Sequence, residues 1–347
     1  MGAGTAGLDA AAVERIDTRG MAMAYSAWPE MARSAYRSAS PLPRGPLPHH
    51  VVFAGMGGSG AISDLFESVL SGDDIHVDVV KGYHLPRTAG PDTLVVATSI
   101  SGNTAETMSV LRSASAAGCR TVSFSDGGSM GEYCERRGLA HVRVRMEHSP
   151  RASLPSFLYA MLGALADELP VRGADVGESI SVLEEIAPSV ADASLGGENP
   201  ALSLAAWLPD IPLVYYPWGL RAAAIRFKNS LQENAKTHAM AEDVMEACHN
   251  GIVAWGRDSR VRPVMVRGGD DHERTKERWG ILEGFFRSRG ISHRTVTAPG
   301  SSILARLVGL MYTLDYASIY RAVMLGVDRT PAGPMGTPRE GFARRGS

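Results

Sequence analysis

The feature that most constrains the fold is a short apolar run, His50–Ala54, that leads into the glycine-rich segment Gly55–Gly60 and then into helical spacing at Ala61–Leu70. An apolar run, a glycine-rich turn and a helical segment in this order indicate a strand, a loop and a helix. Further short β-branched runs occupy residues 76–80, 93–97, 121–124 and 141–144 and alternate with helical segments. This alternation predicts a parallel sheet with helices on both faces.

The same alternation returns, more faintly, in the second half of the chain. An amphipathic helix is expected at 10–36 and a connecting helix at 176–195, followed by strands at 212–216, 262–266 and 293–297 and helices at 220–232, 272–288 and 303–325. We therefore predict an α/β fold of two doubly wound parallel-sheet subdomains, each a flavodoxin-like sandwich. The predicted units are an N-terminal helix and linker (1–48), a first subdomain (49–170), a second subdomain (171–330) and an irregular tail (331–347).

The composition argues against several classes of function. The charged fraction is 21%, the net charge is −2 and no arginine cluster is interleaved with aromatics, so no nucleic-acid partner is expected. No run reaches the ~18 apolar residues of a membrane span, and the first residues carry no secretory pattern, so we expect no membrane partner and a cytoplasmic location. The three widely spaced cysteines and the scattered histidines predict no disulfide framework and no metal site, and no cofactor is expected.

Two loops rich in glycine and hydroxyl groups, Gly55–Gly60 and Ser99–Thr104, are expected at the carboxyl ends of strands. Ligands of open parallel sheets bind at these ends. Free backbone N–H groups at a helix start, together with hydroxyl donors, suit a phosphate group. The candidate phosphate-binding residues are Gly57, Gly58, Ser59, Ser99, Ser101 and Thr104. Read alone, each hydroxyl residue could equally cap a helix or a turn.

The first loop also satisfies the GxGxxG pattern of dinucleotide-binding folds. A dinucleotide site needs an acidic residue at the end of the second strand to hold a ribose, whereas the run 76–80 continues into Lys81-Gly82. The serine-rich loop would have no purpose in such a site. A nicotinamide enzyme is therefore the less favoured interpretation.

Together the two loops resemble the sugar isomerase (SIS) domain, an α/β unit that binds sugar phosphates. Other segments resemble the bifunctional phosphoglucose/phosphomannose isomerase family in their order and approximate spacing. These segments are Pro150–Pro155, Lys228-Asn229, Glu233–Lys236, His249-Asn250, Asp315–Tyr320 and Gly326–Asp328. The resemblance covers roughly residues 50 to 331.

This resemblance implies aldose–ketose isomerisation of a hexose 6-phosphate, between glucose or mannose 6-phosphate and fructose 6-phosphate, through a cis-enediol. It implies that Glu233 is the base, since a carboxylate can move a proton between C2 and C1. It implies that His249 opens the sugar ring and reaches the site from a partner subunit, so that the protein is a homodimer. Arg151 would lie near C1 and C2, where a guanidinium stabilises enediolate charge. Each of these residues, taken alone, would be an ordinary surface or core residue.

The C-terminal tail departs from the family pattern. The family carries a lysine a few residues after a Thr-Pro pair; Thr330-Pro331 matches the pair, and the resemblance implies that Thr330 accepts the mannose epimer. Thr337 stands near the place of the lysine, with Arg339 among the nearest cations, and arginine does not exchange protons as lysine can. Two further hypotheses therefore stay open: an isomerase of a different phosphorylated sugar, and a non-catalytic sugar-phosphate-binding regulator.

Overall fold

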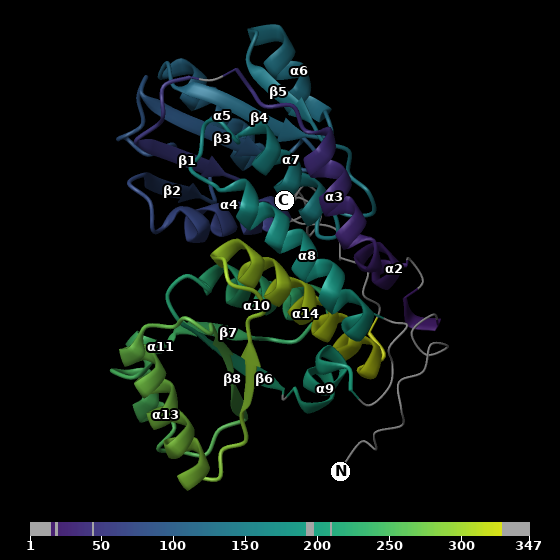
Figure 1. The fold of residues 1–347 in the computed structure, drawn as a ribbon, viewed down its shortest axis with the longest axis vertical. Coiled ribbons are helices and arrows are strands. Elements are labelled where there is room, and N and C mark those ends of the chain that lie inside the picture. The colour runs from purple at the N-terminus through teal and green to yellow at the C-terminus, as the bar shows by residue number, and fades with distance from the viewer. Residues whose placement is uncertain (1–14, 18–19, 44, 192–197, 209, 328–347) are drawn as a thin grey trace, which may run out of the picture.

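The computed structural model describes residues 15–17, 20–43, 45–191, 198–208 and 210–327, which form two parallel sheets with helices between and around them (Figure 1). The first sheet has five strands in the order β2-β1-β3-β4-β5. Their bounds are His50–Ala54 (β1), His76–Val80 (β2), Thr93–Thr98 (β3), Arg120–Ser125 (β4) and Ala140–Arg143 (β5). Every neighbouring pair is parallel. This is the strand order of a doubly wound flavodoxin-like sheet, and the predicted fold class is confirmed.

The second sheet has four parallel strands in the order β7-β6-β8-β9. Their bounds are Ile211–Tyr216 (β6), Met240–Asp243 (β7), Val261–Arg267 (β8) and Arg294–Thr297 (β9). Three of them coincide with expected strands, but β7 was not expected. It is a short edge strand that contains Glu242 and Asp243, so it lacks the apolar run by which a buried strand is recognised.

The N-terminal helix expected at 10–36 needs correction in its described part. It is two helices, α2 (Met21–Ser26) and α3 (Trp28–Ser38), and Gly20 precedes α2 in the left-handed conformation with φ +67°. Pro29 explains the break between them. In a continuous helix its ring would clash with the carbonyl group four residues earlier, and Pro29 has no N–H to donate to that carbonyl. Residues 10–14 lie outside the described residues.

The remaining helices mostly fall between strands. They are α4 (Gly57–Leu70), α5 (Ala105–Ala116), α6 (Gly128–Arg137), α7 (Leu154–Ala164), α8 (Gly173–Val190), α9 (Pro200–Trp207), α10 (Arg221–Asn234), α11 (Val244–Ala247), α12 (Gly251–Ala254), α13 (Glu273–Ser288) and α14 (Ile303–Met324). Of these, α9, α11 and α12 were not expected from the sequence. Helices α8, α10 and α14 lie between the two sheets (Figure 1). Within the described ranges, no helix combines the length and apolarity needed to cross a bilayer.

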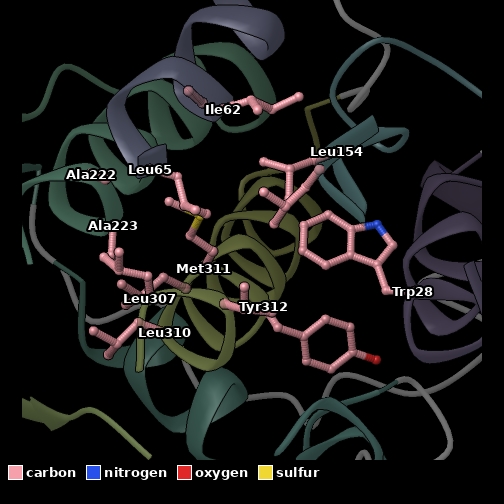
Figure 2. Close-up of a cluster of buried hydrophobic side chains, with 14 of the residues drawn as sticks. Trp28, Ile62, Leu65, Leu154, Ala222, Ala223, Leu307, Leu310, Met311 and Tyr312 are labelled. Carbon is pink, nitrogen blue, oxygen red and sulfur yellow. The ribbon is translucent and has the colours of Figure 1, made fainter. Parts of the chain in front are cut away.

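Helix α14 forms the centre of the core. Its apolar residues point in all directions, which is the pattern of a helix surrounded by protein, and nearly all of its length is buried. Figure 2 shows Leu307 and Met311 among side chains from α3, α4, α7 and α10. One cluster of buried apolar residues runs from Val51 in the first sheet to Val214 in the second. The two sheets therefore share a core, while the predicted unit boundaries stay predictions.

Candidate active site

The two predicted loops leave the first sheet at the same edge. Strands β1 and β3 are neighbouring and parallel, so residues 55–60 and 99–104 both follow carboxyl ends. The chain also changes direction across the sheet at this point, because β2 lies on one side of β1 and β3 on the other. Such a switch point is where ligands of open α/β sheets bind.

Hydrogen bonds join the two loops to each other. The backbone N–H of Ile100 donates to Ser59 Oγ at 3.2 Å, and the hydroxyls of Ser99 and Thr104 are hydrogen-bonded at 2.9 Å. Ser59 and Ser99 are buried, whereas Ser101 is exposed. The predicted hydroxyl residues therefore lie in one connected region, and Ser59, Ser99 and Thr104 also order the loops.

The start of α4 is open on the side that a ligand would approach. Gly57 has φ +54°, a left-handed conformation that favours glycine, and a Cβ built on it meets no atom within 4 Å. Gly58 is constrained differently, since a Cβ there would lie 2.9 Å from the carbonyl oxygen of Pro150. The first N–H groups of a helix have no partner within the helix and carry partial positive charge, so this end of α4 suits an anion.

A third loop, 126–129 after β4, supports the second and was not assigned from the sequence. Asn103 Oδ1 accepts a hydrogen bond from the N–H of Ser129 at 3.0 Å. Gly102 has φ +71°, and a Cβ on it would lie 1.9 Å from the carbonyl oxygen of Gly127. The pair Gly127-Gly128 directly after an expected strand was the available signal.

A pocket of about 340 Å³ opens beside the first loop. Its lining residues are Gly57, Gly58, Ala61, Arg151, Arg226, Asn229, Gln232 and Glu233. They come from the start of α4, the segment before α7, and α10, so the pocket joins the two halves of the chain. A larger hollow of about 810 Å³ lies beside α3 and β5, but it contains none of the predicted site residues. We therefore place the candidate active site in the smaller pocket.

Arg151 and Glu233 form an ion pair in this pocket. The Arg151 side chain is 8% exposed and that of Glu233 is 34% exposed. Arg151 Nη1 also donates to Ser230 Oγ at 2.7 Å, and the buried Nε has no hydrogen-bond partner among the described residues. Two of the three residues to which the resemblance gives catalytic roles are thus in contact.

A second ion pair, between Arg226 and Asp315 of α14, lies directly behind the first. Arg226 Nη2 donates to the backbone carbonyl oxygen of Arg151 at 3.1 Å. Ser230 Oγ donates to Asp315 Oδ1 at 2.6 Å and so connects the two pairs. The sequence analysis assigned neither Arg226 nor Ser230. Polar residues at 226, 230 and 233, which share one face of α10, were the signal that could have found them.

Burial and charge act on the pKa values of this network. Burial lowers the pKa of the Arg151 guanidinium, and the neighbouring Arg226 cation lowers it further, while the negative charge of Asp315 opposes these effects. Burial also lowers the pKa of Arg226, but the charge of Asp315 and the hydrogen bonds to Asp315 and Tyr25 together outweigh this, so the net pKa is raised. Burial raises the pKa of the Tyr25 hydroxyl, and the charge of Asp315 adds to the rise. Because arginine titrates so far above neutrality, both guanidiniums remain cations.

The helix that carries Glu233 ends immediately after it. Lys236 adopts a left-handed conformation with φ +52°, which is unfavourable for a residue with a side chain. Its Nζ donates to the carbonyl oxygen of Glu233 at 2.6 Å. Glu233 therefore lies in the last turn of α10, between the buried ion pairs and a strained helix end.

His249 does not line the pocket. It is an exposed residue of the turn between α11 and α12, and its neighbour Asn250 donates from Nδ2 to Glu246 Oε1 at 2.5 Å. The predicted role of His249 across a subunit interface stays a prediction. Thr330, Thr337 and Arg339 lie outside the described residues.

The residue that follows β2 is Lys81, whose Nζ donates to Asp64 of α4 at 2.6 Å. A dinucleotide site needs an acidic residue at this position to bind the ribose, and here the position holds a cation. The arrangement therefore agrees with the sequence argument against a nicotinamide cofactor.

Proteins of similar sequence and structure identify first the class of this chain and then its family. Residues 197–337 match the model of the bacterial phospho-glucose isomerase C-terminal SIS domain. The tagatose-6-phosphate ketose/aldose isomerase from Escherichia coli has a similar fold, with a TM-score of 0.64 and 16% identity over 95% of this chain and 94% of that chain. The fold is thus that of SIS-domain proteins.

Two curated relatives are more similar in sequence. The bifunctional phosphoglucose/phosphomannose isomerase of Caldicellulosiruptor bescii is 31% identical over 81% of this chain and 86% of its own length. The protein of the same name from Aquifex aeolicus is 28% identical over the same shares. The chain belongs to the bifunctional phosphoglucose/phosphomannose isomerase family.

Proposed function

We propose that this chain is an aldose–ketose isomerase that interconverts glucose 6-phosphate or mannose 6-phosphate with fructose 6-phosphate through a cis-enediol. Family membership and the names of the relatives support the choice of substrate. The observation that carries the proposal is the pocket in which Arg151 and Glu233 lie together beside Gly57 and Gly58. An anion site, a base and a fixed cation within one pocket are the groups that enediol chemistry on a phosphorylated sugar requires.

In this proposal the phosphate group binds at the start of α4 and along the serine-rich loop. Backbone N–H groups of the first turn of α4 donate to it, with Gly57 leaving room for close approach. Ser101 is exposed and adds a hydroxyl donor without adding charge. The sugar carbons then extend from the phosphate toward α10.

The carboxylate of Glu233 removes the proton from C2 of the aldose, and the electron pair forms the C1–C2 double bond of the enediol. The C1=O pair moves to O1, which takes up a proton, and the hydroxyl at C2 gives up its proton when the ketone forms. Glu233 returns a proton to C1 as the carbonyl forms at C2, so the reaction needs no external oxidant or reductant. A base must be ionised, and the ion pair with Arg151 favours the ionised carboxylate. The guanidinium of Arg151, which lines the pocket, stabilises the oxygen on which negative charge develops.

Three finer assignments belong to the same proposal. His249 opens the sugar ring from a partner subunit in a homodimer, which accounts for its position away from the pocket of its own chain. Thr330 admits the mannose epimer. The protein acts in the cytoplasm. The oligomeric state in solution and the epimer ratio of the products test the first two.

Exchange of hydrogen at C2 is the decisive measurement. The protein is incubated with fructose 6-phosphate in deuterated water, and the products are followed by NMR. We expect glucose and mannose 6-phosphates that carry deuterium at C2. Glu233→Gln should abolish the exchange while fructose 6-phosphate still binds, and Glu185→Gln, on the exposed face of α8, should leave both unchanged.

Two other outcomes decide between the alternatives. Deuterium exchange with another phosphorylated sugar, but not with these hexose phosphates, would assign the site to a different substrate. The altered C-terminal tail is the reason for this alternative hypothesis. Tight binding of a hexose phosphate without any exchange would make the chain a sugar-phosphate sensor and overturn the proposal.

A further inference from the structure

Three side chains that commonly bind metal ions lie on one face of the first sheet, at its amino-terminal edge. His50 at the start of β1 is the register partner of His76 at the start of β2, and Asp78 follows two residues after His76. Register partners share a face of a sheet, and so do residues two apart on one strand. The three side chains therefore project into the same small region.

The distances between their potential ligand atoms are close to those in a metal coordination shell. His50 Nε2 lies 2.9 Å and His76 Nε2 lies 3.5 Å from Asp78 Oδ2, and the three potential ligand atoms are within 4.8 Å of one another. Ligand atoms of a tetrahedral zinc site are about 3.3 Å apart, since each lies ~2.0–2.1 Å from the ion. Only the two histidines need to move closer together, and the His76 side chain, which is 67% exposed, is free to do so.

A neighbouring strand holds the ring of His50 in place. Thr93 is the register partner of His50 on β3, and its Oγ1 lies 3.2 Å from His50 Nδ1. The same hydroxyl accepts a hydrogen bond from the N–H of Gly90 at 3.0 Å. A hydrogen bond at one ring nitrogen fixes the orientation of the ring and directs the other nitrogen to the ion, as at established metal sites.

From this geometry we infer that His50, His76 and Asp78 bind a divalent transition-metal ion of the zinc type, with water completing the coordination. Two imidazoles and one carboxylate form a ligand set that zinc accepts. The ion crosslinks β1 to β2 and so stabilises the sheet. The site is separate from the candidate active site, because β1 runs from His50 toward the phosphate loop, a rise of roughly 13 Å at 3.3 Å per residue.

No metal site is expected from the sequence, because the histidines are scattered along it. Here two ligands come from different strands, and only their register brings them together. The pair His76-x-Asp78, which puts both side chains on one strand face, was the single local signal.

The test uses the full chain after treatment with a chelator. Zn²⁺ is titrated by calorimetry, and Co²⁺ is added separately as a coloured probe of coordination. We expect one ion per chain with saturable binding, a visible Co²⁺ band typical of nitrogen and oxygen ligands, and a melting temperature that rises with Zn²⁺ concentration. His76→Ala and Asp78→Asn should each weaken binding at least tenfold and remove the rise.

His84→Ala is the matched control, since His84 is an exposed histidine of the same half of the chain. It should leave the affinity for Zn²⁺ unchanged. Wild-type binding no tighter than that of His76→Ala, or absent, would reduce the cluster to a His–Asp–His hydrogen-bonded group and overturn the inference. Deuterium exchange on fructose 6-phosphate is measured before and after chelation. Because the metal site and the candidate active site lie at opposite ends of β1, exchange that continues without zinc shows that the two proposals stand or fall independently.

Discussion

Arg226 and Asp315 form an ion pair with Nη2 and Oδ2 2.6 Å apart, and their side chains are only 1% and 0% exposed. The pair connects α10 to α14 across the centre of the molecule. It also supports the candidate active site, because Arg226 binds the backbone carbonyl of Arg151 and Asp315 accepts from Ser230. Stability and the geometry of the site therefore depend on the same buried charges.

Asp315→Asn should destabilise the protein by about 3–5 kcal/mol, the usual cost of leaving a buried charge without its partner. The substitution keeps the shape of the side chain but leaves the buried Arg226 cation without its counter-charge. Urea unfolding followed by circular dichroism measures the change. The control is Arg33→Ala, which breaks the half-exposed pair with Glu184 and should cost less than about 1 kcal/mol. Equal losses in the two variants would contradict the role given to the buried pair.

Ser230→Ala should lower kcat about tenfold and change KM little. The hydroxyl orients the Arg151 guanidinium through Nη1 and lies 0% exposed, so it has no direct route to a bound sugar. If Ser230 only maintained the fold, its replacement would lower the free energy of unfolding but would not lower kcat while leaving KM unchanged. Steady-state kinetics and urea unfolding are measured together, and Ser181→Ala, an exposed serine of α8, is the control. A change confined to KM would show that Ser230 acts on binding instead.

Gly102→Ala and Gly118→Ala separate two costs of replacing a glycine. Both residues have similar positive φ, +71° and +73°, but a Cβ on Gly102 would lie 1.9 Å from the carbonyl oxygen of Gly127, and one on Gly118 meets nothing within 4 Å. Gly118→Ala should cost about 1 kcal/mol, from the backbone conformation alone. Gly102→Ala should cost at least twice as much and also weaken binding of fructose 6-phosphate. Thermal unfolding measures the loss of stability in each variant, and a titration measures binding of fructose 6-phosphate. Equal losses of stability would mean that the loop after β4 can move away from the added methyl group without cost.

Glu178 should contribute stability that is lost in acid. Its carboxylate accepts from Ser302 and from the backbone N–H groups of Ser301 and Ser302, and these bonds lower its pKa from 4.5 to about 2. Since the folded-state pKa lies below the ordinary value, the contribution is complete above about pH 4.5 and disappears as the pH falls toward 2. Glu178→Gln should therefore lower the urea midpoint at pH 6 and lower it less at pH 3. A difference that stays constant between the two pH values would exclude this linkage.

Much of the fold could be predicted because its elements carry local signals. Runs such as His50–Ala54 and Ile211–Tyr216 are apolar and end at glycine or proline, and the alternation of strands with helices selects a parallel sheet. The edge strand β7 could not be found in this way, because its four residues, Met240–Asp243, contain two acidic residues and no β-branched residue. The break between α2 and α3 could have been read from Pro29, whose ring excludes a continuous helix.

The site was predictable in a different way. The two loops follow from glycine and serine at strand ends, whereas the roles of Glu233 and Arg151 came only from family resemblance. No spacing rule places Arg151 beside Ser230 or Arg226 beside Asp315, because these contacts join segments 75 or more residues apart. Thr330 lies outside the described residues, and its role in the site stays a prediction.

The pocket takes the loop proposed to bind phosphate from one half of the chain and Glu233, the proposed base, from the other. The distance between base and phosphate is therefore not a property of either sheet but of the way the halves are packed through α10 and α14. A substitution deep in that packing, far from any sugar atom, would change the alignment of the proton acceptor with C2 before it unfolded the protein. Such variants would lose unfolding free energy and turnover together, because the buried contacts of α10 and α14 determine both.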